Sequence, residues 1–270
     1  PAPIPQPTES PLLRDLTIDY GPPSVLGPFF LKADTAARNR GVSLSFGTFD
    51  DLLAANEANR ANWRGLIGVF NPRHHDIAPG TAFCVLGRNG RGDVVAAHAA
   101  RLLEWPETTY YREATSLRLF YKDPDTMKNP GESCEITAQS THAISGRVVF
   151  SGAAWYHPDY RGRKLSAILP RIGKAYALAK WNPDHIVSMM VEDVHSRAFA
   201  PRFGYTNIDW EIRMTNSSLG SVKLAFLSMT PADVISYTRD FLEKFPEQLD
   251  RGVLDGGGEQ PAVAVAGRKG

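Results

Sequence analysis

The stretch from Arg147 to Trp181 constrains the fold most, because it has the pattern of a strand, a basic turn and a helix in immediate succession. Residues 148–156 are rich in β-branched and aromatic residues around a small-residue centre, which is typical of a strand that another backbone or a ligand approaches closely. Pro158 ends this strand, and residues 160–164 place three cations and a glycine in one turn. Apolar residues then recur at helical spacing, namely Leu165, Ile168, Leu169, Ile172 and Tyr176.

A strand that passes through such a turn into a helix can hold a phosphate group. The first backbone N–H groups of a helix have no intrahelical acceptor, and the helix dipole is positive there. The alternative is a solvated basic loop over an ordinary strand–helix junction. Pro170 lies inside the apolar pattern, where it would remove a helical hydrogen bond. We therefore expect a helix that begins after Leu165 or is kinked at Pro170.

The segment His157–Ser166, HPDYRGRKLS, resembles the cofactor loop of the GCN5-related N-acetyltransferases, the GNAT superfamily. In that family a Pro-x-Tyr-Arg-Gly turn and an Arg/Gln-x-x-Gly-x-Gly/Ala signature hold the pyrophosphate of acetyl-CoA. Arg161 matches the first position, whereas Lys164 and Ser166 replace the two glycines, so this chain is a divergent member by resemblance. The resemblance implies a set of contacts with acetyl-CoA: Ala154, Trp155, Tyr156, Arg161, Gly162, Arg163, Lys164, Leu165 and Ser166.

A second resemblance follows at the spacing that this family would require. Residues 185–191 form an apolar strand, and residues 196–205 look like the family's next helix, which ends in Gly-Phe/Tyr. Gly204 fits the position just after a helix C-terminus. The tyrosine with which many family members protonate the departing CoA thiolate would fall on Ala200. The usual general acid is therefore replaced in this chain.

Together the two resemblances imply an α+β fold with a mixed, mostly antiparallel central sheet flanked by helices. The rest of the chain supplies the other elements of that fold, with strands predicted at 12–20, 42–46, 81–86, 94–103, 210–214 and 222–228. Thr48 caps a helix predicted to run to about Trp63, residues 28–40 form another, and Thr230 caps the last.

We expect one acyltransferase domain over residues 11–250, between flexible tails at 1–10 and 251–270 that are rich in Pro and in Gly. An insert at about 105–146 separates the predicted hairpin from the central strand. Loops of this length in compact domains are usually functional or disordered, and the aromatic content of this one argues against disorder. We expect it to form part of the acceptor pocket or a subunit contact, or else to add a strand pair that caps the sheet.

The function that the resemblance implies is acyl-CoA-dependent N-acyl transfer, with acetyl-CoA as donor and a primary amine of a small molecule or peptide as acceptor. Glu192 is the first candidate for the base, with Asp193 and His157 behind it, and Tyr156 or Tyr205 would supply the proton to the thiolate. The carboxylates of Asp159, Glu192 and Asp193 near this site favour a cationic amine as the acceptor. The alternatives are a non-catalytic binding or regulatory protein of the same fold, and an aminoacyl or long-acyl transferase that uses a carrier or tRNA donor.

The composition of the chain limits the kinds of partner that it is expected to bind. With 30 basic and 29 acidic residues the chain is nearly neutral, which does not favour nucleic-acid binding. No apolar run approaches the roughly 20 residues of a membrane span, so we expect a cytoplasmic protein, with a homodimer as one possible assembly. Cys84 and Cys134 lack metal-ligand spacing, and we expect them to be free buried thiols, with a single disulfide as the alternative. The adjacent His74 and His75 would point to opposite faces of a strand, and we therefore expect no metal site.

Overall fold

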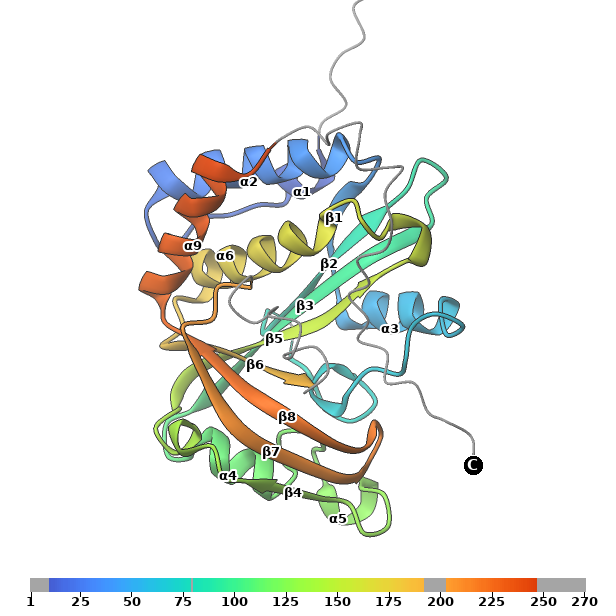
Figure 1. The fold of residues 1–270 in the computed structure, drawn as a ribbon, viewed down its shortest axis with the longest axis vertical. Coiled ribbons are helices and arrows are strands. Elements are labelled where there is room, and N and C mark those ends of the chain that lie inside the picture. Colours follow the sequence, from blue (N-terminus) through green and yellow to red (C-terminus); the bar gives the residue numbers. More distant parts are fainter. Residues whose placement is uncertain (1–9, 79, 192–202, 247–270) are drawn as a thin grey trace, which may run out of the picture.

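The computed structural model describes residues 10–78, 80–191 and 203–246, and its fold is drawn in Figure 1. The helices are α1 (Pro11–Arg14), α2 (Pro23–Arg38), α3 (Phe49–Ala58), α4 (Tyr110–Thr115), α5 (Pro124–Met127), α6 (Leu169–Trp181) and α9 (Pro231–Lys244). Four 3-10 helices join them: η1 (Gly68–Phe70), η2 (Gln139–His142), η3 (Pro158–Tyr160) and η4 (Leu165–Ala167). None of the described helices is long and apolar enough to cross a bilayer.

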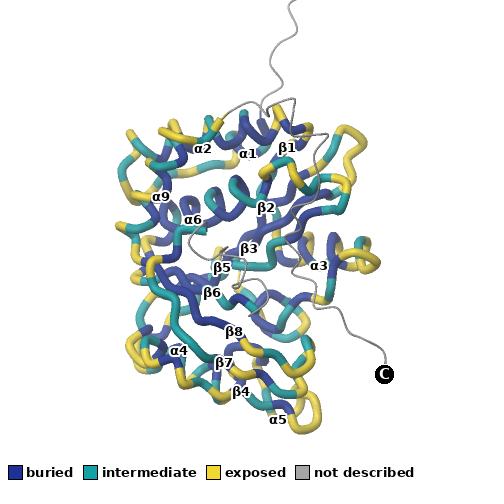
Figure 2. The backbone as a smooth tube through the Cα atoms, in the orientation of Figure 1, coloured by how far each residue is buried: buried dark blue, intermediate teal, exposed yellow. Residues whose placement is uncertain are grey.

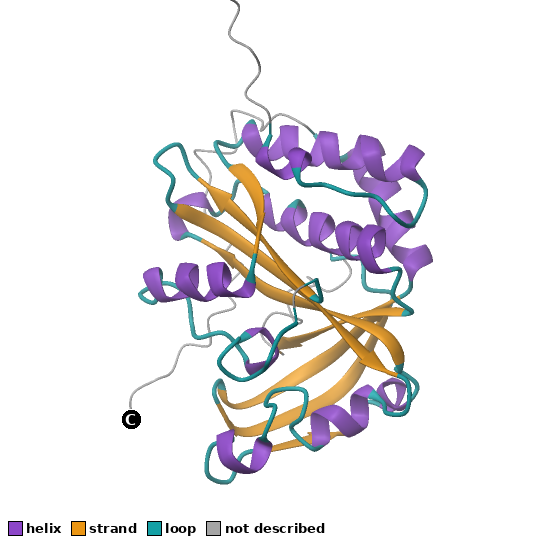
Figure 3. Ribbon diagram, turned by 180° about the vertical axis from the view of Figure 1, so that it is seen from behind, coloured by secondary structure: helices purple, strands orange, loops and turns teal. Residues whose placement is uncertain are grey.

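In the described ranges, eight strands form one sheet in the order β1-β2-β3-β5-β6-β8-β7-β4. They are β1 (Ser43–Gly47), β2 (Ala82–Arg88), β3 (Val94–Trp105), β4 (Ser133–Ile136), β5 (Gly146–Tyr156), β6 (His185–Val191), β7 (Asn207–Ser217) and β8 (Gly220–Met229). Only the β5–β6 pair is parallel, and every other described pair is antiparallel. The predicted α+β class with a mixed, mostly antiparallel sheet is confirmed, and Figure 3 shows the sheet from behind.

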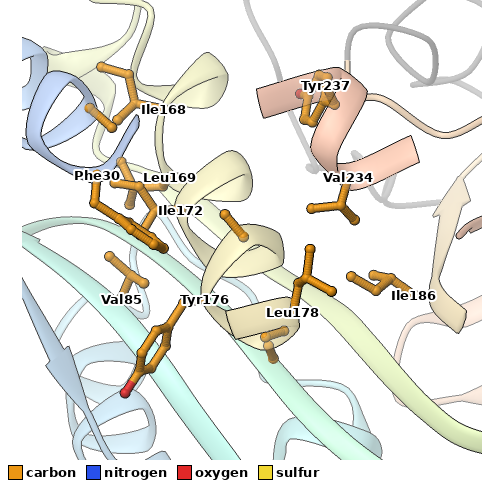
Figure 4. Packing of buried hydrophobic residues seen from close by; sticks show 14 of the residues in the cluster. Phe30, Val85, Ile168, Leu169, Ile172, Tyr176, Leu178, Ile186, Val234 and Tyr237 are labelled. Carbon is orange, nitrogen blue, oxygen red and sulfur yellow. The ribbon is translucent and has the colours of Figure 1, made fainter. Parts of the chain in front are cut away.

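Helices cover the two faces of this sheet, and each face has its own hydrophobic core. Side chains alternate along β5, so that Val149 packs with α2, α6 and α9, whereas Val148 and Phe150 pack with α3, η1 and α4. Figure 4 shows part of the first core, in which Ile172 of α6 lies beside Phe30 of α2, and Val234 of α9 lies near Ile186 of β6. Burial is deepest where α6 lies over the central strands (Figure 2). We call these faces the α6 face and the α3 face.

Several predicted elements have different bounds in the structure. Residues 12–20 form no strand, because Ser10 caps the short helix α1 instead, its hydroxyl accepting from the Leu13 amide. Helix α2 begins at Pro23 rather than Pro28, which it accommodates in its interior. Helix α3 has the predicted capping box at Thr48 but ends at Ala58, well before Trp63. Helix α6 begins at Leu169, so Pro170 lies in the first turn, where its missing N–H costs little.

The insert extends the sheet by one strand. It contains α4, α5, β4 and η2, and β4 pairs with β7 at the edge of the sheet rather than forming a separate strand pair. Tyr110 and Phe120 of this insert are buried in the core of the α3 face. Cys84 and Cys134 are both free and buried, as predicted.

Candidate functional site

The site is built around the place where β5 and β6 part. The two strands pair only at Val148 with His185, Val149 with Ile186 and Phe150 with Val187. Beyond this point β5 continues beside β3 and β6 continues beside β8. Because the parallel strands diverge, the sheet has a gap between residues 151–156 of β5 and residues 188–191 of β6.

A β-bulge bends β5 beside this gap. Ala97 of β3 pairs with Trp155 and Ala99 pairs with Gly152, so Ala153 and Ala154 face the single residue His98 across the ladder. Ala153 adopts a left-handed conformation with a φ of 51°. Bulges leave one residue outside the ladder and re-aim its neighbours. The bulge therefore interrupts the regular ladder of β5 beside the gap.

A cavity of about 230 Å³ fills the gap. Its lining includes Trp63, Phe70 and Trp155 from the core of the α3 face and Tyr156 and Tyr205 from the core of the α6 face. The cavity therefore passes from one face of the sheet to the other between β5 and β6. Such a passage allows two substrates to meet from opposite sides.

The basic turn lies at the α6-face end of this cavity, where Arg161, Ser166 and Pro170 belong to the lining. Gly162 and Lys164 both have left-handed conformations, with φ values of 79° and 58°. The backbone amide groups from Gly162 to Ser166 donate to no acceptor among the described residues. Consecutive free amides in such a turn form a concave site for anions.

The two arginines of the turn have different surroundings. The Nε atom of Arg161 is buried without an acceptor in the described part of the chain, and this residue lines the cavity. Arg163 instead donates from Nη1 to the Arg40 carbonyl at 3.1 Å and lies over the Tyr160 ring at 4.2 Å. Arg163 thus fixes the turn against the end of α2, and Arg161 is the arginine with a donor to offer a ligand.

A buried polar network lies beside the gap and consists of His98, Ser151, Ser188 and Tyr205. His98 Nε2 lies 3.2 Å from Ser151 Oγ, and the side chains of Ser188 and Ser151 lie close enough to Tyr205 to affect its pKa. Burial raises the pKa of Tyr205 to about 12, against the opposing effect of these two serines. The phenol therefore keeps its proton at neutral pH. All four residues line the cavity.

Lys174 of α6 lies against this network. Its side chain is 1% exposed, its Nζ donates to the Phe203 carbonyl, and the same Nζ lies 3.9 Å from the centre of the Tyr205 ring. Burial, and to a lesser extent the charge of Arg171, holds the pKa of Lys174 well below its usual range. The amino group of Lys174 therefore lies over the face of the Tyr205 ring.

His98 gives the protein a dependence of stability on pH. Burial, followed by the charge of Lys174, lowers the pKa of His98 to about 3. In the unfolded chain His98 binds a proton near its ordinary pKa of about 6.5, whereas in the folded protein it does so only near pH 3. The contribution of neutral His98 to stability is therefore fully present above about pH 6.5 and is lost as the pH falls. Between pH 7 and pH 5 we expect His98 to remove about 2 kcal/mol of unfolding free energy. Urea unfolding of the wild type and of His98→Gln at pH 7 and pH 5 measures this effect. The unfolding free energy should fall less between the two pH values in His98→Gln than in the wild type, and an equal fall in both proteins would contradict the prediction.

The structure brings together part of the predicted site. Five of the predicted contacts line the cavity, namely Ala154, Trp155, Tyr156, Arg161 and Ser166, as does Tyr205. Gly162, Arg163 and Lys164 form the turn beside it, whereas Leu165 is buried in the core of the α6 face. The hydroxyl of Tyr156 is buried with no partner among the described residues, and burial raises its pKa.

Other predicted residues lie elsewhere. Glu192, Asp193 and Ala200 fall outside the described residues. His157 and Asp159 line a separate cavity of about 510 Å³ between α3 and the β2–β3 turn, so they lie outside the lining of the central cavity. None of the described residues of the insert lines the central cavity, which does not support a part for the insert in the acceptor pocket. Within the described ranges no group of three or more possible metal ligands occurs, and the expectation of no metal stays a prediction.

Sequence reasoning missed His98, Ser151, Ser188, Lys174 and the segment 62–67, which all line the cavity. Two of them carry a signal in the sequence. Lys174 lies in a helix that is apolar nearly all round, so its burial follows from the pattern. His98 is a lone polar residue among the alanines of a central strand. The two serines carry no comparable signal.

No family model and no curated protein sequence matches the chain. Among solved structures it is similar to a variant of the spermidine N-acetyltransferase SpeG from Vibrio cholerae, with 8% identity, a TM-score of 0.41 and coverage of 72% of this chain and 96% of that chain. It is also similar to NAA60 from Arabidopsis thaliana in complex with a bisubstrate analogue, with 9% identity, a TM-score of 0.42 and coverage of 70% and 98%. A third is yncA from Salmonella typhimurium with its cofactor acetyl-CoA, with 11% identity, a TM-score of 0.40 and coverage of 71% and 94%.

Proposed function

We propose that the chain is an acyl-CoA-dependent N-acyltransferase, which transfers an acetyl group from acetyl-CoA to a primary amine. The observation that carries this proposal is the passage between β5 and β6, with a basic turn at one end whose amide groups donate to no acceptor among the described residues, and with a buried tyrosine beside it. An acyl-CoA needs a place for its pyrophosphate, a narrow channel for its thioester arm and a donor for the thioester carbonyl. The residues present fit each of these requirements.

The turn would hold the pyrophosphate. The amide groups of residues 162–166 donate to the anion, and the positive end of the α6 dipole adds to the attraction. Arg161 contributes its buried donor, which has no acceptor among the described residues. Lys164, which replaces a glycine of the GNAT signature, adopts the left-handed conformation that a glycine would favour and keeps its side chain exposed at the turn.

The bulge of β5 would polarise the thioester carbonyl. Ala153 and Ala154 have no separate partners on β3, and β6 has already parted from β5 at this level. Amide groups fixed in this way stabilise the negative charge that develops on the carbonyl oxygen during acyl transfer. The neutral amine then attacks the carbonyl carbon from the α3-face end of the cavity.

Two proton transfers complete the reaction. Glu192, which follows Val191 in the sequence and lies outside the described residues, is the proposed base that removes the proton from the attacking nitrogen. Tyr205 is the proposed acid that donates its proton to the sulfur, because its high pKa keeps the phenol protonated. Ser151 lies beside the phenol and its Oγ is 3.2 Å from His98 Nε2, so these residues offer a path by which the phenol would regain a proton.

Calorimetric titration of the purified protein with CoA and acetyl-CoA, followed by an assay of thiol release with a panel of amines, tests this function. We expect stoichiometric binding that weakens at higher salt, since the contacts are ionic, and thiol release that depends on the amine. Binding without thiol release for any amine would indicate a non-catalytic protein of this fold. Absence of binding would refute the proposal.

A further inference from the structure

We infer that the end of the cavity at Arg64 binds a carboxylate, so that the acceptor is an aromatic or apolar amine that also carries a carboxylate, such as an aromatic α-amino acid. This inference rests on the proposed function, because it names the substrate that enters from the α3 face. Three observations carry it: the aromatic wall of the cavity, the charge of its lining and the surroundings of Arg64.

The α3-face end of the cavity is an aromatic wall. The rings of Trp63 and Trp155 stack with centroids 4.7 Å apart and an interplanar angle of 4°. Trp155 Nε1 donates to the Asn62 carbonyl at 3.1 Å, which fixes the ring, and Phe70 adds a third aromatic side chain to the lining. A rigid wall of this kind favours an aromatic or apolar body, because it buries area without ordering flexible side chains.

The charge of the lining disfavours a polyamine. Among its described residues the cavity has three basic residues, Arg64, Arg161 and Lys174, and no Asp or Glu. Apart from the proposed base Glu192, which lies outside the described residues, the second ammonium group of a polyamine would meet no carboxylate in the lining, and buried charges without a partner are costly. Asp159, one of the acids that favoured a cationic amine in the sequence, lies at the other cavity.

Arg64 is placed to take the carboxylate. It follows Trp63 directly, it is partly exposed, and its side chain makes no ion pair or hydrogen bond with the described residues. Its backbone is held, because Asn56 Nδ2 donates to the Arg64 carbonyl at 2.7 Å. A second guanidinium lies nearby, since a Cβ on Gly65 would be 2.9 Å from Arg60 Nη1. A guanidinium binds a carboxylate through two parallel hydrogen bonds.

The other basic residues of the lining are already accounted for. Arg161 lies at the turn, where the proposed donor binds, and Lys174 is buried against Tyr205 on the α6 face. Arg64, Trp63 and Trp155 lie together at the opposite end. Because the amine and the carboxylate of an α-amino acid are bonded to the same carbon, a carboxylate held by Arg64 would place the amine in the same cavity, which residues 151–156 of β5 also line.

The test compares three amines in an acetyl-CoA thiol-release assay: L-phenylalanine, phenethylamine and spermidine. Phenethylamine is a matched control, because it is phenylalanine without the carboxylate. We expect kcat/KM to fall in the order phenylalanine, phenethylamine, spermidine. Arg64→Met should lower kcat/KM about 10- to 100-fold for phenylalanine, as expected for a lost charge-assisted contact, and change it less than about twofold for phenethylamine. Arg112→Met, on α4 outside the lining, is the control for the loss of a surface charge.

Three results would overturn the inference. Spermidine could be the best acceptor, or Arg64→Met could lower kcat/KM equally for phenylalanine and phenethylamine. The third result is that Arg64→Met lowers kcat/KM only with a donor that itself carries a carboxylate, such as succinyl-CoA. Calorimetry with L-phenylalanine separates this inference from the proposed function. Binding that Arg64→Met weakens, without thiol release, supports the carboxylate site and refutes the transferase. Thiol release with other amines but no binding or turnover of phenylalanine supports the transferase and refutes the carboxylate site.

Discussion

Arg161→Glu should raise the dissociation constant of CoA about 100-fold, with little change in protein stability. The substitution removes a donor that has no acceptor among the described residues and places a negative charge where the pyrophosphate would lie. A lost charge-assisted hydrogen bond together with the repulsion corresponds to about 3 kcal/mol of binding free energy. Because no ion pair of Arg161 occurs in the described part of the chain, we expect the unfolding free energy to change by less than about 0.5 kcal/mol.

Isothermal calorimetry with CoA at two salt concentrations measures this effect. Arg112→Glu is the matched control, since it makes the same change of charge on an exposed residue of α4 outside the cavity lining. Arg163→Glu is a poorer probe, because Arg163 holds the turn through the Arg40 carbonyl and its loss would disturb the turn itself. If Arg161→Glu binds CoA as tightly as Arg112→Glu does, the anion site is not at this turn.

The parts of the fold that sequence predicted well are those that local patterns determine. The hairpin of β2 and β3 has two apolar strands around a turn of Asn, Gly and Asp, and Thr230 caps α9 with both hydrogen bonds of a capping box. The order strand, turn and helix at residues 147–181 is a local pattern too. Such patterns act within a few residues and need no knowledge of distant contacts.

The ends of helices and strands were predicted less well where a tertiary contact competes with the local secondary-structure propensity. Residues 12–20 have strand-like composition, yet Ser10 caps a short helix there and its hydroxyl also donates to Asp34 of α2 at 2.8 Å. The helix α3 stops at Ala58, and Asn56 turns to the carbonyl of Arg64 in the following segment. This early end is what allows residues 62–67 to reach the cavity.

From the sequence, only the part of the candidate site on β5 and the turn after it was predicted well. The prediction was incomplete for a physical reason. His98, Ser151, Ser188 and Tyr205 come from four separate stretches of the chain that only the sheet order brings together. The gap itself arises because β5 and β6 pair over three residues and then follow different neighbours. No residue pattern in either strand specifies the length of that pairing. A sequence can thus indicate the anion site while giving no sign of the network beside it.

Tyr205→Phe should lower kcat for amine acetylation by about 100- to 1000-fold and leave the affinity for CoA unchanged, because general acid catalysis is worth factors of this size. The variant keeps the ring that packs over Lys174 Nζ and loses only the hydroxyl that Ser151 and Ser188 contact. Single-turnover kinetics of thiol release measure the effect, and CoA calorimetry is the check that the donor site is intact. The lost hydroxyl should cost about 1 kcal/mol of unfolding free energy.

Tyr156→Phe is the matched control for this prediction. Both phenols are buried in the lining of the cavity, but only Tyr205 belongs to the network that leads to His98, whereas the Tyr156 hydroxyl has no partner among the described residues. We therefore expect Tyr156→Phe to retain kcat within about tenfold of the wild type. A large loss in Tyr156→Phe together with full activity in Tyr205→Phe would assign the acid to Tyr156 and leave the network a structural role. If kcat falls strongly in Tyr205→Phe but not in Tyr156→Phe, and Ser151→Ala also lowers kcat, the proton path runs along Tyr205, Ser151 and His98.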